Sequence, residues 1–251
     1  MAGVDGRVAM VTGGGRGIGL ATANLLASRG AKVICVARSE GELKAAGHEY
    51  VVADLGTAQG CEQAVAEAET KLGPADIFVC NHGIGSAHER VVWEQDPEIW
   101  AETMRVNLDG PFFLSRLLLK GMTERGYGRV VYTSSTAGLL AEPAGSAYNS
   151  SKHGLLGLMR SVSLDGGPYG VTANAVLPGW VRTEMAERSA NQEAKDRGLT
   201  VAEIWEERAA LYPPGRVVEP QEVAEAIAFL AGEESGGISG EAIRVALGSV
   251  W

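Results

Sequence analysis

The stretch RVAMVTGGGRGIGLATANLLASRG, residues 7–30, decides the fold. It begins with an apolar run typical of a buried strand, continues with five glycines between positions 13 and 19, and then carries apolar residues at helical spacing. Gly30 follows as the residue that ends the helix. Small residues let a backbone approach a pyrophosphate, and the N-terminus of the next helix offers free N–H groups. The stretch therefore predicts a strand–turn–helix unit that binds a nucleotide; a tight turn without a ligand is the alternative.

The rest of the chain repeats this alternation of apolar runs and helical patterns. Further strands are expected at 31–38, 49–55, 75–83, 128–135, 170–179 and 240–248, and helices at 57–73, 97–125, 147–166 and 219–232, with a break near Gly110-Pro111. Continuous apolar strands suit a parallel sheet covered by helices on both faces. We therefore predict an α/β fold: one Rossmann-like, doubly wound domain over residues 1–251 with about seven strands. The charged segment 183–216 looks less regular, and is either a lid over a cleft or a solvated helical excursion.

Composition excludes several classes of function. The chain of 251 residues has a net charge of −9 and no Lys/Arg cluster, so we expect no nucleic-acid partner. No apolar run approaches the roughly 20 residues that span a bilayer, and the N-terminus lacks a signal-peptide core, so a cytoplasmic protein without a membrane partner is expected. Cys35, Cys61 and Cys80 are expected to be buried free thiols. The histidines show no metal-ligand spacing, so no metal is expected.

Tyr148 and Lys152 are the first candidates for chemistry. They stand four residues apart on an expected helix and so share one face. A tyrosine hydroxyl has an ordinary pKa of about 10, and a neighbouring ammonium favours its phenolate form, which makes it a better acid near neutral pH. Asn149-Ser150-Ser151, between them, fits a glycosylation pattern that a cytosolic chain does not use. A packing pair on the helix surface is the alternative for Tyr148 and Lys152.

Several motifs together resemble the short-chain dehydrogenase/reductase family. The glycines fit no register of G-x-G-x-x-G, but Thr12-Gly13 through Gly19 resembles the family turn TGxxxGxG. Tyr148 and Lys152 fit its YxxxK motif, with Ser135 thirteen residues upstream. CNHG, VNLDG and PGWVRTEM resemble further family motifs, and the matches run from residue 7 to about 245.

The resemblance implies a role for each matching residue. In the family the tyrosine donates a proton, the lysine binds the nicotinamide ribose, the serine bonds the substrate oxygen, and an asparagine holds a water in the proton relay. These catalytic roles fall on Tyr148, Lys152, Ser135 and Asn107. The cofactor residues implied are Gly13, Arg16, Gly17, Ile18, Gly19, Arg38, Asp54, Leu55, Asn81, Gly83, Tyr148, Lys152, Pro178, Gly179 and Thr183.

The end of the second strand favours NADP over NAD. Ala37 stands where NAD-dependent relatives commonly carry an acidic residue for the ribose. Arg38, just beyond it, and Arg16 in the glycine turn suit a 2′-phosphate. The alternative leaves both arginines in solvent, with Glu40 or Glu42 holding an NAD ribose.

The expected substrate is a small-molecule ketone or secondary alcohol of hydrophobic character. Its predicted site consists of Ser135, Tyr148, Leu139, Leu140, Ala144, Gly145, Trp180 and Met185, with Trp205 and Tyr212 from the lid. The polar residues with which hydroxybutyrate dehydrogenases bind a carboxylate look absent, which disfavours a small hydroxy acid. An NAD-dependent dehydrogenase and a non-catalytic NADPH-binding protein are the alternatives. The resemblance also implies a homotetramer or homodimer. One departure stands out, since His82 replaces the alanine that the family usually carries.

Overall fold

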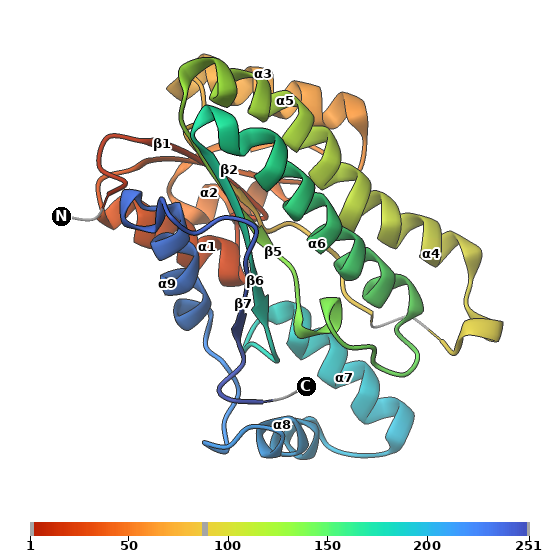
Figure 1. Ribbon diagram of the computed structural model, residues 1–251. Helices are drawn as coiled ribbons and strands as arrows, with labels where there is room; N and C mark the ends of the chain where they lie inside the picture. The colour runs from red at the N-terminus through yellow and green to blue at the C-terminus, as the bar shows by residue number, and fades with distance from the viewer. Residues whose placement is uncertain (1–2, 87–89, 250–251) are drawn as a thin grey trace.

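The computed structural model describes residues 3–86 and 90–249, and its centre is a seven-stranded sheet (Figure 1). All neighbouring strands are parallel, in the order β3-β2-β1-β4-β5-β6-β7. The strands are β1 Val8–Thr12, β2 Lys32–Ala37, β3 Glu49–Val52, β4 Ile77–Cys80, β5 Gly128–Thr133, β6 Val171–Pro178 and β7 Ala242–Val245. The chain winds outward from β1 to β3, returns to the centre at β4 and winds the other way. The predicted doubly wound parallel fold is confirmed, and its strand order reverses between β1 and β4, where such sheets bind ligands.

Helices cover both faces of the sheet (Figure 1). One face carries α1 (Gly17–Ser28), α2 (Glu40–Ala46) and α9 (Pro220–Ala231), and the other carries α3 (Ala58–Leu72), α4 (Pro97–Met104), α5 (Gly110–Arg125) and α6 (Ser146–Gly166). The strands are apolar on both sides because each face packs against such a helix layer. Cys35, Cys61 and Cys80 are buried free thiols in these cores, as predicted.

The break predicted near Gly110-Pro111 is wrong. The chain stays helical from α4 into α5 and widens over Arg105–Asp109 into a π turn, in which the Gly110 N–H donates to the Arg105 carbonyl. Pro111 then falls in the first turn of α5, where its missing N–H is tolerated. Gly110-Pro111 does mark an irregularity in the helix, but the irregularity is a π turn and not the end of the helix.

The segment 183–216 is more regular than its composition suggested. It contains α7 (Glu184–Arg197) and α8 (Val201–Ala210), which lie beyond the end of the sheet (Figure 1). The buried side of α7 consists of Ala186, Ala190 and Ala194, four residues apart, so a narrow apolar stripe suffices amid many charges. These alanines share a small core with α8, which shows that the excursion has packing of its own.

The described residues contain neither a membrane-spanning helix nor a cluster of metal-binding side chains. None of their helices is long and apolar enough to cross a membrane. No group of three or more His, Cys, Asp and Glu side chains in residues 3–86 and 90–249 is placed to hold a metal ion. His88 lies outside the described residues.

Candidate active site

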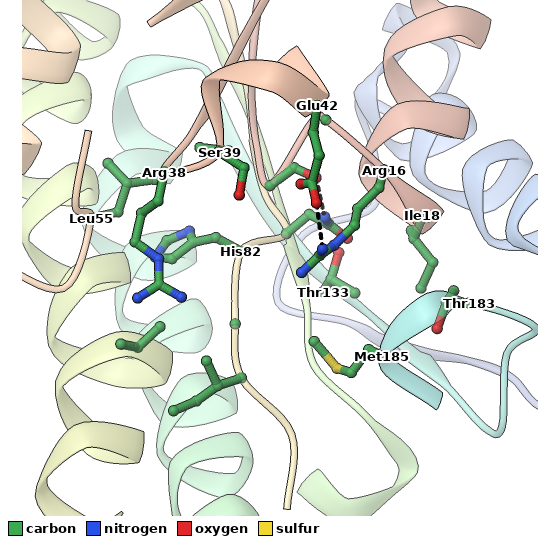
Figure 2. A pocket seen from close by; sticks show the side chains of 18 of the residues that line it. Arg16, Ile18, Arg38, Ser39, Glu42, Leu55, His82, Thr133, Thr183 and Met185 are labelled. Carbon is green, nitrogen blue, oxygen red and sulfur yellow. Dashed lines mark hydrogen bonds and ion pairs between the residues drawn. The ribbon is translucent and has the colours of Figure 1, made fainter. Parts of the chain in front are cut away.

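A groove opens at the carboxyl ends of the strands, where the strand order reverses between β1 and β4 (Figure 2). Its walls come from the glycine turn, the ends of β2 to β5, α6 and the start of α7. The predicted cofactor residues that line it are Gly13, Arg16, Gly17, Ile18, Arg38, Asp54, Leu55, Asn81, Gly83, Tyr148, Lys152 and Thr183. Gly19, Pro178 and Gly179 are not among its lining residues. Most of the predicted positions therefore meet in one place, although they are scattered along the chain.

The glycine turn is shaped for a close approach of a phosphate. Gly13 and Gly17 have φ values of 65° and 54°, which favour glycine. A Cβ on Gly19 would lie 2.1 Å from the Gly13 carbonyl oxygen, so this residue closes the turn from behind instead of facing the groove. The helix that follows has no side-chain cap and no acidic residue in its first turn. Its free N–H groups and positive end therefore fit the diphosphate of a dinucleotide.

The two predicted phosphate-binding arginines are in different situations. Arg16 Nη1 lies 2.6 Å from Glu42 Oε1 and 3.2 Å from Glu184 Oε2, so its charge is already compensated. Arg38 is exposed and forms no hydrogen bond or salt bridge within residues 3–86 and 90–249. Figure 2 shows Arg16 meeting Glu42, whereas Arg38 extends along the wall that Leu55 also forms. Arg38 is therefore the arginine more available to a ligand, and Glu42 brings a carboxylate into the same groove.

Lys152 and Tyr148 face the groove from the first turns of α6. The Lys152 ammonium is buried, donates to the Thr133 carbonyl at 3.0 Å and lies 5.6 Å from the centre of the Tyr148 ring. Burial lowers the pKa of Lys152 to about 8. The side chain therefore remains mostly cationic at neutral pH, beside a half-buried tyrosine.

Asn107 lies on the π turn, behind the groove. Its side chain pairs twice with the backbone of Ile84: Nδ2 donates to the carbonyl at 2.9 Å, and Oδ1 accepts from the N–H at 2.8 Å. Nδ2 also lies 3.2 Å from Ser151 Oγ. A Cβ on Gly83 would lie 3.1 Å from Asn107 Oδ1 and 3.6 Å from Lys152 Nζ, so the glycine leaves room between these polar groups.

Ser135 lies two residues after the end of β5 and is not among the residues that line the groove. Its Oγ accepts from the Ala137 N–H at 3.1 Å, which begins a short 3₁₀ turn, Thr136–Gly138. Sequence reasoning missed its neighbour Thr133, whose carbonyl holds Lys152. Thr133 Oγ1 is buried and has no hydrogen-bond partner among the described residues, and Thr133 lines the groove. Strand residues of this kind leave no motif that a sequence search can find.

The predicted substrate wall is partly wrong. Met185 lines the groove and is 40% exposed, whereas Leu139 and Leu140, 44% and 41% exposed, are not among the lining residues. Trp205 and Tyr212 instead pack inside the core between α7 and α8, because a buried arginine, Arg208, holds that core together.

Arg208 explains why these aromatic residues turn inward. Its guanidinium lies 3.6 Å from the centre of the Trp180 ring and 2.9 Å from Glu193 Oε2. Tyr212 Oη accepts the Trp180 backbone N–H at 2.6 Å and occupies the side of Gly179 where a Cβ would stand. Trp180 and Gly179 therefore contact the base of the segment that contains α7 and α8, and Gly145 is the buried residue before α6.

A second hollow adjoins the mouth of the groove. It is lined by Ser86, Arg90, Val91, Glu94, Ala144, Ser189, Gln192, Glu193 and Asp196. The predicted wall residue Ala144 belongs to this hollow.

Known proteins resemble this chain over nearly its whole length. A family model described as enoyl-(acyl carrier protein) reductase matches residues 13–249. An acetoacetyl-CoA reductase of Rhizobium meliloti is 36% identical over 94% of this chain and 95% of its own. A D-beta-hydroxybutyrate dehydrogenase of Cupriavidus necator is 34% identical over 99% and 96%. The crystal structure of a variant of actinorhodin polyketide ketoreductase with NADPH superposes with a TM-score of 0.90, at 33% identity over 99% of this chain and 98% of its own.

Proposed function

Since the chain belongs to the short-chain dehydrogenase/reductase family, whose members bind NAD or NADP and act on hydroxyl or keto groups, we propose that it transfers a hydride between NADP(H) and a hydrophobic ketone or secondary alcohol. One observation carries the proposal. The buried Lys152 ammonium lies 5.6 Å from the Tyr148 ring, and both residues line the groove at the switch point of the sheet.

The chain's own residues supply the acid and hold it in place. When bound, the reduced nicotinamide supplies the hydride, and the carbonyl oxygen then needs a proton. Tyr148 donates that proton from its hydroxyl, and the Lys152 charge stabilises the phenolate that remains. Thr133 fixes Lys152 through its carbonyl, at 3.0 Å. Ser135 is assigned to the substrate oxygen, and Asn107 to the groups that return a proton to Tyr148.

The preference for NADP rests on the charges in the groove. Arg38 is exposed there without a salt bridge among the described residues, and no acidic side chain stands at position 37. A 2′-phosphate suits this arginine. Glu42 supports the competing choice of NAD, because its carboxylate lines the same groove and is able to accept from a ribose hydroxyl.

The substrate proposal rests on exposed apolar side chains. Met185 lines the groove, and Leu139 and Leu140 lie in the segment between Ser135 and Tyr148; these residues favour a hydrophobic carbonyl compound. The acetoacetyl-CoA reductase and the polyketide ketoreductase are named for the reduction of a carbonyl group, which supports reduction as the direction to assay first. Because another relative is a D-beta-hydroxybutyrate dehydrogenase, the assays should also include oxidation of a hydroxy acid.

Tyr148→Phe tests the proposal. A panel of apolar ketones, with NADPH followed by its absorbance, measures turnover; quenching of protein fluorescence measures cofactor binding. We expect turnover to fall by about 10²–10⁴-fold, the usual contribution of a general acid, while the Kd for NADPH stays within about threefold. The matched control is Tyr169→Phe, at a 55% exposed tyrosine outside the groove, which should leave both unchanged. Full activity of Tyr148→Phe would refute the assigned acid.

A further inference from the structure

We propose that His82 is a positioning residue: its ring carries a proton on Nε2 and offers it to the Val106 carbonyl, thereby holding the π turn that carries Asn107. The residue lies in the loop after β4 and lines the groove (Figure 2). The catalytic part of this proposal rests on the proposed function; the hydrogen-bond part does not.

The Val106 carbonyl has lost both of its possible helical donors. In an α-helix it would accept from the Gly110 N–H, but that N–H donates to Arg105 across the π turn. In the π register it would accept from residue 111, which is a proline and has no N–H. A buried backbone carbonyl without a donor costs free energy, so a side chain nearby is expected to serve it.

The surroundings of Thr12 decide which ring nitrogen of His82 carries the proton. Thr12 Oγ1 accepts from the backbone N–H groups of Asn81 and His82, at 3.0 and 3.3 Å, which fills both of its lone pairs. The Thr12 hydroxyl has two acceptors within reach, the Val79 carbonyl at 3.2 Å and His82 Nδ1 at 2.8 Å. Because the two backbone N–H groups engage its lone pairs and Nδ1 is the nearer acceptor, we assign the hydroxyl proton to Nδ1. A neutral ring then has its hydrogen on Nε2.

The other end of the ring points at the π turn. A Cβ on Gly110 would lie 3.0 Å from His82 Nε2 and 2.2 Å from the Leu55 carbonyl oxygen, so the imidazole edge is wedged against that turn. Nε2 is buried and meets no partner of ordinary hydrogen-bond geometry within the described ranges. The Val106 carbonyl is the backbone acceptor that acts on this ring and raises its pKa. The proposal pairs this unpartnered nitrogen with that carbonyl.

The ring stays neutral in this environment. Burial, and then the charge of Lys152, lower the pKa of His82 to about 3. The Nε2 hydrogen is therefore present at any pH at which the protein is assayed. An alanine at this position would leave the carbonyl unserved, and Asn107, the next residue, would lose its fixed geometry toward Ile84.

Pro111 makes a direct test possible. His82→Ala should speed hydrogen exchange of the Ile84 amide, which donates to Asn107 Oδ1, by about tenfold or more. It should lower kcat for ketone reduction by about 10- to 100-fold, as expected for a displaced polar group, with KM little changed. Adding Pro111→Ala restores an N–H that can serve Val106 in the π register, and should return both quantities to within about threefold of wild type. Because Pro111→Ala fills no part of the space left by the ring, a volume-filling role of His82 would not be rescued.

Two further measurements keep the proposal decidable. The ¹⁵N shifts of the imidazole in the wild-type protein should show Nε2–H; the Nδ1–H form would overturn the proposal. Where His82→Ala does not fold, His82→Asn keeps an acceptor toward Thr12, while its shorter side chain places no donor at the position of Nε2. It should show the same faster exchange and the same rescue. Unchanged exchange in the His82 variants, or absence of rescue, refutes it. If neither the wild type nor any variant reduces a ketone, the proposed function fails. The ¹⁵N shifts of the imidazole and the hydrogen exchange of the Ile84 amide still decide the role of His82.

Discussion

The charge of Lys152 should lower the free energy of unfolding, and the amount can be worked out from the burial of its ammonium group. The side chain is 5% exposed, and its ammonium donates to the Thr133 carbonyl at 3.0 Å. No carboxylate in the described part of the chain pairs with it. Burial without a counter-charge lowers its pKa from 10.5 to about 8. Lys152→Met keeps most of the volume and removes the charge.

The sign of the pH dependence follows from these two values. Because the folded-state pKa lies below the unfolded one, the unfolded chain binds more protons between about pH 8 and pH 10.5. The wild-type protein therefore gains stability as the pH rises through this window. A difference of about 2.5 units at about 1.36 kcal/mol each gives a charge penalty of about 3 kcal/mol at neutral pH. About 2 kcal/mol of that penalty should be gone near pH 9.5.

Equilibrium unfolding in urea without cofactor, at about pH 7 and about pH 9.5, measures the effect. The wild-type free energy of unfolding should rise relative to Lys152→Met by about 2 kcal/mol between the two conditions. Lys120→Met, at an exposed lysine on α5, is the control and should track the wild type. If the free energies of unfolding of Lys152→Met and wild type change by the same amount between the two pH values, burial does not lower the pKa of Lys152, and the destabilising effect of its charge is refuted.

Two other substitutions test the cofactor side of the groove. Gly19→Ala places a Cβ 2.1 Å from the Gly13 carbonyl oxygen, so the turn must open and NADPH binding should weaken by about tenfold or more, whereas Gly157→Ala, which meets nothing within 4 Å, should bind as the wild type does. Equal binding by the two variants would contradict the role of the turn. Arg38→Asp should raise the KM for NADPH by about 10- to 100-fold and leave that for NADH within about threefold, because it repels only a 2′-phosphate. A parallel rise in both KM values would favour a general role of Arg38 in folding or binding.

The sequence predicted the features that depend on local pattern. Continuous apolar strands and the glycine turn were enough to predict the parallel sheet and the turn after its first strand, because both are set by residues close in the chain. The buried alanine stripe of α7 was missed, since Ala186, Ala190 and Ala194 stand among charged residues that dominate any average. A core residue need not be large when the facing helix supplies the bulk.

Long-range pairing accounts for most of what the sequence did not show. Arg16 and Glu42 are 26 residues apart, and nothing local indicates that they meet at 2.6 Å across the groove. Trp205 was assigned to the cleft because aromatic residues suit substrates. The structure turns it inward, where Arg208 stacks 5.1 Å from its ring centre. An aromatic residue can therefore line a cleft or pack in a core, and only the residues packed against it show which of the two applies.

Several departures from ordinary folding rules lie around the groove. Helix α1 starts without a cap, Lys152 is a buried charge without a described acidic partner, and Thr133 Oγ1 is buried without a hydrogen bond in the described part of the chain. By contrast, α8 and α9 begin with capping boxes and do not line the groove. Buried oxygens that are unpaired within the described residues also occur away from the groove, at Tyr127 and Thr172, so the groove differs in the kind of group rather than in the number. A helix end and a charge that the fold leaves uncompensated suit a binding and proton-transfer site, because donors and charges that are already satisfied within the fold have nothing to offer a ligand.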